Sequence, residues 1–267
     1  MASLPRISVI TVCFNAQDSI EKTIRSVVGQ TYDNLEYLII DGASKDDTLT
    51  IVDRFRDLIE RSGRIISEPD KGLYDAMNKG VRFATGKWVL FMNADDIFVD
   101  EKVVADVAAF ISEHPEAEIV YGDSEQVLEY GIYHVRPQEA YMNHKMTISH
   151  QATFVKTEVQ RSHPFDLRYR FAADFEQLSH FYLEGRTFIH IDRMIARVEM
   201  RGGTTFDNTI ASAEELYSII AARGVDIEAE KNKMIRHKKM VRAFKQWIPG
   251  PISKPVLKLI AKYYKPL

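Results

Sequence analysis

The segment PRISVITVCFNAQDSIEKTIRSVVGQTYDNLEYLIIDG, residues 5–42, decides the fold class. Ile7 to Cys13 is apolar and rich in β-branched residues, which predicts a strand buried on both faces. Asp18 and Glu21 then form a capping pattern for a helix whose apolar residues recur at helical spacing. A second apolar strand, Leu35 to Ile40, follows. This order predicts parallel strands joined by a crossover helix.

The same alternation of strand and helix patterns continues to about residue 111. It predicts an α/β fold with a doubly wound, mostly parallel sheet and helices on both faces. Beyond residue 118 the strand patterns become shorter. Expected strands are 64–67, 88–92, 147–155, 187–192 and 195–199, and expected helices are 51–59, 74–84, 103–111 and 172–184.

Polar residues follow three of the expected strands directly. They are Asn15, Asp41 and the run Asn93-Ala94-Asp95-Asp96. Open α/β sheets bind ligands at the carboxyl ends of their strands, and these residues should meet at that edge. The spacing therefore predicts a polar binding site there.

Asp95 and Asp96 are adjacent carboxylates at the end of the apolar run WVLFM. A hard divalent cation would relieve their repulsion, and Mg²⁺ or Mn²⁺ prefers carboxylate and phosphate oxygens. Taken alone, the run could equally be a turn whose acids cap the next helix. The other converging loops favour a metal site.

Three segments, ISVITVCFNAQDSIEKTIRSVVGQTY, LEYLIIDGASKDDT and EPDKGLYDAMNKGVRFATGKWVLFMNADD, resemble glycosyltransferase family 2 in order and spacing. The resemblance is strong over residues 5 to about 110 and looser to about 205. It implies a GT-A catalytic domain over 1–205, with a nucleotide-sugar-binding half (1–110) and an acceptor and catalytic half (111–205). It also implies inverting, metal-dependent transfer of a sugar from a nucleotide sugar, UDP being the family's usual nucleotide.

The resemblance assigns donor-side roles to particular residues. The family's D-x-D motif corresponds to Asn93-Ala94-Asp95, so Asn93 replaces the first acid. Asp95, with Asp96 beside it, would hold Mn²⁺ or Mg²⁺. Asp41 would bond the base or ribose, or else cap the helix after the turn that carries it. The other donor-binding residues implied are Thr11, Cys13, Phe14, Asn15, Asp70, Lys71, Asp75, Asn78 and Arg201.

The resemblance places the catalytic base at the start of a helix about 80 residues past the metal motif, which corresponds to Asp174. The base would take the proton of the acceptor hydroxyl during inverting transfer. Asp174 could instead only stabilise the helix N-terminus, in which case Glu176 is the second choice. Acceptor-side candidates are His150, Gln151 and Asp123, although His150 and Asp123 could also be structural.

The chain of 267 residues carries a basic C-terminal segment. Eleven of its 35 Lys and Arg residues lie between Lys231 and Leu267, and all 38 acidic residues precede them. Residues 206–267 are expected to form a helical extension with amphipathic, basic helices that associate with an anionic membrane. Docking on the acidic body is the alternative, and nucleic-acid binding is not expected.

The N-terminal apolar run is interpreted as a strand, and no stretch is long enough to span a membrane. With the single cysteine, this predicts a cytoplasmic protein at the inner face of the membrane. The expected acceptor is a lipid-linked glycan of surface polysaccharide or glycolipid synthesis.

Two alternatives to a glycosyltransferase fit the sequence less well. A nucleotidyltransferase should have a Gly-rich phosphate loop with Arg and Lys after the first strand, and TVCFNAQDS has none. A non-catalytic module has no need for the acids at 95, 96 and 174. The donor sugar and the acceptor stay open.

Overall fold

The computed structural model describes residues 4–129, 131–139, 142, 147–201, 209–226, 228–229, 231–232, 234–236 and 239. The loop expected at 201–205 lies outside them except for Arg201. The amphipathic helices expected in the basic segment, from Met234 onward, lie outside them except for residues 234–236 and 239. Within the described part of the chain, no helix has the length and apolar character needed to cross a membrane.

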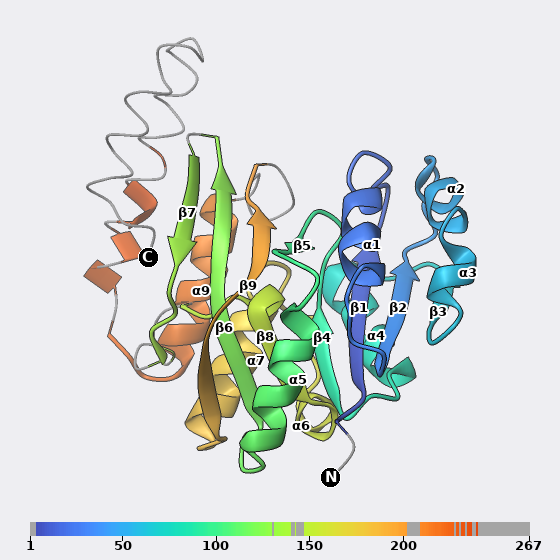
Figure 1. The fold of residues 1–267 in the computed structure, drawn as a ribbon. Helices are drawn as coiled ribbons and strands as arrows, with labels where there is room; N and C mark the ends of the chain where they lie inside the picture. The colour runs from blue at the N-terminus through green and yellow to red at the C-terminus, as the bar shows by residue number, and fades with distance from the viewer. Residues whose placement is uncertain are drawn as a thin grey trace.

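One nine-stranded sheet runs through the molecule in the order β3-β2-β1-β4-β8-β6-β9-β5, and β7 pairs with β6 (Figure 1). The half formed by β3, β2, β1 and β4 is parallel throughout, as the crossover pattern predicted. In the other half, β8 runs antiparallel between β4 and β6. The strands are β1 (Ile7–Cys13), β2 (Leu35–Asp41), β3 (Arg64–Ser67), β4 (Trp88–Phe91), β5 (Ile97–Phe98), β6 (Ile119–Leu128), β7 (Gly131–Val135), β8 (Thr153–Lys156) and β9 (Phe188–Glu199).

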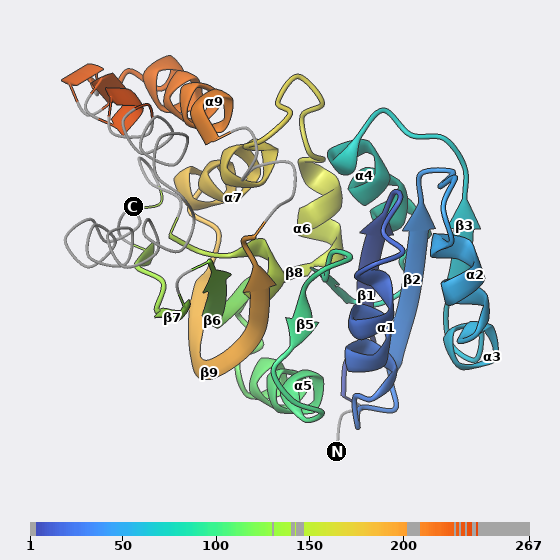
Figure 2. The same ribbon diagram turned by 90° about the horizontal axis from the view of Figure 1, so that it is seen from above.

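Helices cover both faces of the sheet (Figure 2). One face carries α1, α2, α3 and α5, and the other carries α4, α6 and α7, with α9 packed against α7. The helices are α1 (Ile20–Val28), α2 (Thr48–Asp53), α3 (Arg56–Ile59), α4 (Leu73–Phe83), α5 (Val103–Glu113), α6 (Thr157–Ser162), α7 (Ala173–Leu183), α9 (Thr209–Ala222) and the 3₁₀ helix η2 (His150–Ala152).

The apolar run of β1 is explained by burial on both faces. Ile7 and Val9 pack in the core under α1 and α5, whereas Ile10 and Val12 pack under α4. All seven β1 residues are buried. The α/β fold with helices on both faces is therefore confirmed.

Three expected elements differ in detail from the structure. The helix expected over 51–59 is two short helices, α2 and α3. The strand expected over 147–155 begins only at Thr153, because His150–Ala152 forms η2. The two strands expected within 187–199 are the single strand β9.

Gly80 allows α4 to lie directly on β1. A Cβ atom at this position would lie 2.4 Å from Cγ2 of Ile10, which is wholly buried. Alanine favours a helix over glycine by about 1 kcal/mol. The steric overlap in a filled core should outweigh this gain.

Gly80→Ala is therefore expected to lower the free energy of unfolding by about 1–3 kcal/mol, measured by urea denaturation. The matched experiment is a double-mutant cycle with Ile10→Ala, which removes the methyl group in the way. G80A should cost nothing further in the I10A background. A stabilising effect of G80A alone would show that the contact between α4 and β1 is loose.

Candidate active site

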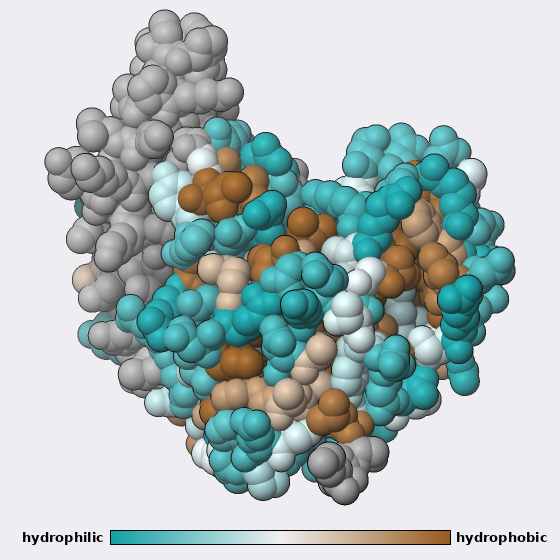
Figure 3. All heavy atoms as spheres, viewed as in Figure 1, coloured by the Kyte–Doolittle hydropathy of each residue, from teal (hydrophilic) through white to brown (hydrophobic). Residues whose placement is uncertain are grey.

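The candidate active site lies where the carboxyl ends of β1 and β4 approach the start of α7. Figure 3 shows the surface hollowed on this face, between α1 and the far ends of β6 and β9. Residues from both halves of the chain meet here, because η2 and α7 follow β4 by more than 50 residues.

Asp174 lies in the first turn of α7 and is held by three donors. His150 Nδ1 lies 2.9 Å from Oδ2, and Tyr74 donates its hydroxyl to Oδ1 at 3.0 Å. The backbone N–H of Phe175 also donates to Oδ1, at 2.9 Å. Burial opposes ionisation of Asp174, but the hydrogen bonds from His150, Phe175 and Tyr74 outweigh it, so the pKa of Asp174 lies below its usual value. Asp174 is therefore a carboxylate at neutral pH, and its side chain is 16% exposed.

His150 connects Asp174 to the end of β4. Asn93 Nδ2 lies 3.0 Å from His150 Nε2. An amide nitrogen only donates, so Nε2 accepts, and Nδ1 carries the proton given to Asp174. Asn93, His150 and Asp174 thus form one continuous chain of hydrogen bonds.

Asp95 and Asp96 point to different surroundings. Asp96 is 3% exposed, and its two oxygens accept bonds from Gln151 Nε2 and from the backbone N–H of Glu199, both at 2.9 Å. Burial raises the pKa of Asp96 to about 6. The side chain of Asp95 is 44% exposed, and its carboxylate has Lys22 Nζ 3.9 Å away. In this arrangement Asp96 braces the site, and Asp95 has the more accessible oxygens for a cation. A cation held by both acids stays a prediction.

The turn that carries Asp95 is held from α1. The hydroxyl of Thr23 accepts the backbone N–H of Asp95 at 3.1 Å and donates to the carbonyl of Asp96 at 2.8 Å. Asp95 has a φ of 151°, a strained value for a residue with a side chain. Oδ1 of Asn93 is buried and has no hydrogen-bond partner among the described residues. An exposed carboxylate and an unbonded amide oxygen are a donor set that suits Mg²⁺ or Mn²⁺.

Three residues expected to contact the nucleotide lie inside the fold. Thr11 is wholly buried and donates to the carbonyl of Met92. Asp41 is also wholly buried, and Ser44 and Ser67 bond its two oxygens. Burial and the nearby carboxylate of Asp41 raise the pKa of the Cys13 thiol. Asp41 does not cap α2, whose N-cap is Asp47, so its helix-capping alternative is not what the structure shows. Contact of Thr11, Cys13 and Asp41 with the nucleotide stays a prediction.

Phe14 and Asp70 are the accessible part of the expected nucleotide site. Phe14 is 61% exposed. A Cβ atom at Gly42 would lie 2.5 Å from Asp70 Oδ2 and 3.2 Å from Phe14 Cδ2. Gly42 therefore leaves room that any other residue would fill. Asn15 fixes this rim, because its Oδ1 accepts the backbone N–H of Lys45 at 2.8 Å.

The segment around α4 is partly structural. Asp75 accepts the backbone N–H of Lys71 at 3.0 Å, and the Lys71 residue is exposed. Asn78 makes two bonds with the backbone of Phe165, at 2.9 and 3.0 Å. It therefore fastens the segment before α7 to α4 instead of offering its amide to a ligand.

Arg201 and Asp123 lie at the margins of the candidate site. Arg201 follows β9 and pairs with Glu199 at 2.7 Å, and this carboxylate raises the pKa of Arg201. Asp123 pairs with His190 at 2.8 Å. The structure thus joins Gln151 to the site through Asp96, but gives Asp123 a partner of its own.

Tyr74 is the site residue that sequence reasoning missed. Burial and the charge of Asp174 raise its pKa well above the usual value, so it stays a hydrogen-bond donor. Its place in the segment GLYDAMNKG was the only available signal, because no spacing rule connects it to Asp174.

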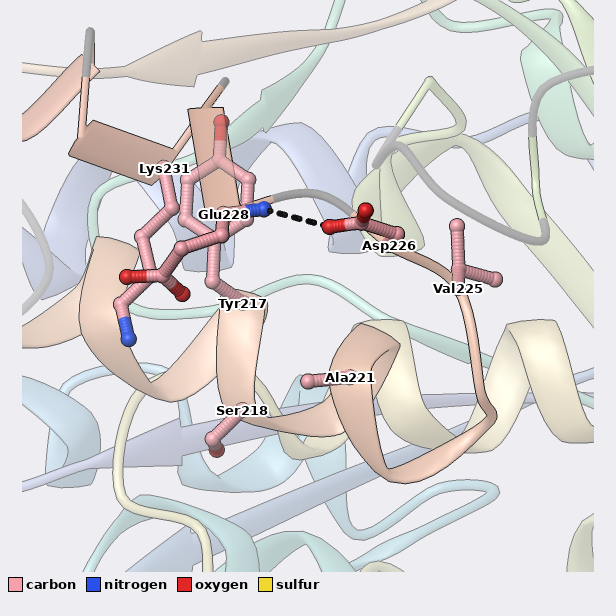
Figure 4. A pocket seen from close by; sticks show the side chains of 7 residues that line it. All are labelled: Tyr217, Ser218, Ala221, Val225, Asp226, Glu228 and Lys231. Carbon is pink, nitrogen blue, oxygen red and sulfur yellow. Dashed lines mark hydrogen bonds between the residues drawn. The ribbon is translucent and has the colours of Figure 1, made fainter.

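A hollow beside α9 is separate from this site (Figure 4). None of the residues that line it was a predicted site residue. They are Tyr217, Ser218, Ala221, Val225, Asp226, Glu228 and Lys231.

Comparison with known proteins gives consistent matches. The sequence model described as Glycosyl transferase family 2 matches residues 8–164. A PGL/p-HBAD biosynthesis glycosyltransferase of Mycobacterium tuberculosis (strain H37Rv) is 35% identical over 177 residues, which are 64% of this chain and 68% of the relative.

Two solved structures share the fold. S. aureus TarS 1–349 in complex with UDP-GlcNAc has a TM-score of 0.67 and 21% identity, over 86% of this chain and 70% of TarS. The mannosyltransferase PcManGT from Pyrobaculum calidifontis, in complex with GDP-Man and Mn²⁺, has a TM-score of 0.65 and 18% identity, over 99% and 82% of the two chains.

Asp96→Asn should change how stability depends on pH. The pKa of Asp96 rises from 3.8 to about 6 on folding, so its contribution to stability is complete below pH 4 and is lost as the pH rises through 6. Across this window the metal-free wild type should lose about 3 kcal/mol of unfolding free energy relative to D96N. Urea unfolding of both chains in EDTA measures the difference.

Asp95→Asn is the matched control, because its exposed side chain should leave the wild-type pH dependence intact. If wild type and D96N show parallel curves, Asp96 is not the buried acid that the structure describes.

Proposed function

The chain belongs to glycosyl transferase family 2 and is a glycosyltransferase, and from this we propose an inverting, metal-dependent transfer with Asp174 as the base. The supporting observation is the chain of hydrogen bonds from Asn93 through His150 to Asp174. It connects the strand that precedes Asp95 to the carboxylate proposed to take the proton.

The proposed proton transfer uses the free lone pairs of Asp174. His150 and Tyr74 each bond one oxygen, and a carboxylate can accept about four bonds in all. The acceptor hydroxyl would give its proton to Asp174 while its oxygen attacks the anomeric carbon of the donor. His150 and Tyr74 hold the carboxylate in place and keep it ionised until then.

The proposed donor is a nucleotide sugar, most simply a UDP-sugar. The solved relatives of the same fold were complexed with UDP-GlcNAc and with GDP-Man and Mn²⁺. Phe14 offers an exposed ring for the base to stack on, beside the space left by Gly42 and Asp70. A bound Mg²⁺ or Mn²⁺ would neutralise charge on the departing diphosphate. Asp95 would hold it, with Asn93 Oδ1 as the nearest further oxygen, and Lys71 and Arg201 are the proposed phosphate contacts.

The proposed acceptor is a hydroxyl of a lipid-linked glycan, reached by a peripheral association with the inner face of the cytoplasmic membrane. The basic segment after Lys231 supports this proposal through its charge and its amphipathic pattern. Met234 packs on the cluster between α7 and α9, so at least this residue docks on the body of the protein.

Asp174→Asn is expected to lower kcat by about 10²–10⁴-fold, because the amide cannot take the proton. The Kd for UDP with Mn²⁺ should stay unchanged. The kcat is measured as UDP release from those UDP-sugars of a panel that the wild type uses. The Kd is measured by calorimetry. Tyr74→Phe, which removes one bond to Asp174 but keeps the base, should lose only about tenfold. Full activity in D174N would exclude Asp174 as the base.

Asp95→Asn is expected to abolish the effect of Mn²⁺ on UDP binding. Wild-type UDP affinity should fall when EDTA replaces Mn²⁺, whereas D95N should bind UDP equally weakly in both. Lys22→Gln removes the neighbouring cation and serves as the control, which should keep its dependence on Mn²⁺. A Kd that responds to Mn²⁺ in D95N as in wild type would contradict the proposed ligand.

Replacing Lys254, Lys258, Lys262 and Lys265 by Gln should reduce flotation of the full chain with phosphatidylglycerol vesicles. Neutral phosphatidylcholine vesicles provide the baseline for both chains. Equal flotation of wild type and variant on the anionic vesicles would rule out this stripe of lysines as the membrane contact.

A further inference from the structure

A group of metal-ligating side chains lies outside the candidate active site, where α6 ends beside α7. His163 Nε2 is 3.0 Å from Glu176 Oε2. One ligand atom from each of His163, Glu176 and His180 lies within 4.8 Å of the others. The two imidazole rings stack with their centroids 3.7 Å apart. Within the part of the chain that the structure describes, no other group of three His, Cys, Asp or Glu residues converges in this way.

The backbone that carries these side chains is fixed from several helices. Glu176 and His180 are one turn apart on α7 and therefore share a face. Gln177 donates to the carbonyl of His163, and Arg223, directly after α9, donates to the carbonyl of Glu176. The three side chains are thus held near one another by contacts other than their own.

The ligand chemistry differs from that of Asp95. Two imidazoles and one carboxylate are the protein ligands of many Zn²⁺ sites, in which bonds to nitrogen are about 2.0–2.1 Å. Tetrahedral ligand atoms at this distance are roughly 3.4 Å apart, so small side-chain rotations would close the group around an ion. Glu184 lies 3.1 Å from His180 Nε2 and adds a carboxylate at its edge.

We propose that His163, Glu176 and His180 form a second metal site, for Zn²⁺ or a similar transition-metal ion, distinct from the oxygen ligands at Asp95. Each residue gives one lone pair to the ion, and the imidazoles bind as neutral ligands. The ion fastens the segment that begins at His163 to α7. That segment ends at Ala172, where α7 starts, so the site fixes the helix that carries Asp174 without touching the reacting groups.

The test is Zn²⁺ binding to the full chain after removal of metals with EDTA and dialysis. Calorimetry should find one tightly bound Zn²⁺ in wild type and an affinity at least about 100-fold weaker in H163Q/H180Q. His134→Gln is the matched control, because His134 also pairs with a glutamate, Glu125 at 3.2 Å, but belongs to no such group. H134Q should bind like wild type. Asp95→Asn should also bind like wild type, which separates the two sites.

Two further measurements keep the result decisive if the double variant folds poorly. Glu176→Gln conserves shape and should still lose most of the Zn²⁺ affinity. Co²⁺ added to wild type and to D95N should give the intense visible absorption of a four-coordinate site with nitrogen ligands. Equal Zn²⁺ affinity in wild type and E176Q, loss of binding in D95N alone, or no such Co²⁺ absorption would each overturn the proposal.

Discussion

The buried carboxylate of Asp96 is the contact on which the rest of the site depends. It joins the turn after β4 to Gln151 in η2 and to the backbone at the end of β9. Burying a carboxylate is costly unless donors surround it, and here two donors offset only part of that cost, as the raised pKa shows. Three segments that are distant in sequence are thereby held at one edge of the sheet.

This bracing explains how two adjacent acids serve different purposes. The turn places Asp96 inward, and Thr23 holds the backbone on the opposite side. Asp95 then adopts a strained φ and keeps its carboxylate at the surface. Strain of this kind persists only where the surroundings impose it, and it is common where a protein holds a ligand.

The sequence predicted the parallel half of the sheet well, because buried strands and amphipathic helices produce a local pattern of apolar residues. β1, β3 and the meeting of the loops at one edge follow from such patterns. Hydrogen bonds between residues distant in sequence produce no such local pattern. His150 and Asn93 are 57 residues apart, and Tyr74 and Asp174 are 100 apart.

The same limit explains why the hydrogen-bond partners of Asp41 and Asn78 could not be predicted from the sequence. Asp41 stands at a strand end, as a ligand-binding acid would, but Ser44 and Ser67 bond both its oxygens. Asn78 is an exposed-looking amide in a motif, yet it bonds the backbone of Phe165. Which polar groups are left for a ligand depends on tertiary neighbours that no local pattern contains.

The bonds from Asn93 to His150 and from Tyr74 to Asp174 both join residues of the first hundred positions to residues beyond position 140. One half of the chain therefore cannot be exchanged for that of a relative without regard to the other half. A hybrid enzyme assembled from the donor-binding half of one relative and the catalytic half of another would keep its sheet. Its carboxylate would keep its partners only where the two halves supply both members of each pair. These two pairs therefore constrain how sugar specificity can be exchanged between such enzymes. We expect changes in the loops around the site to be tolerated more readily.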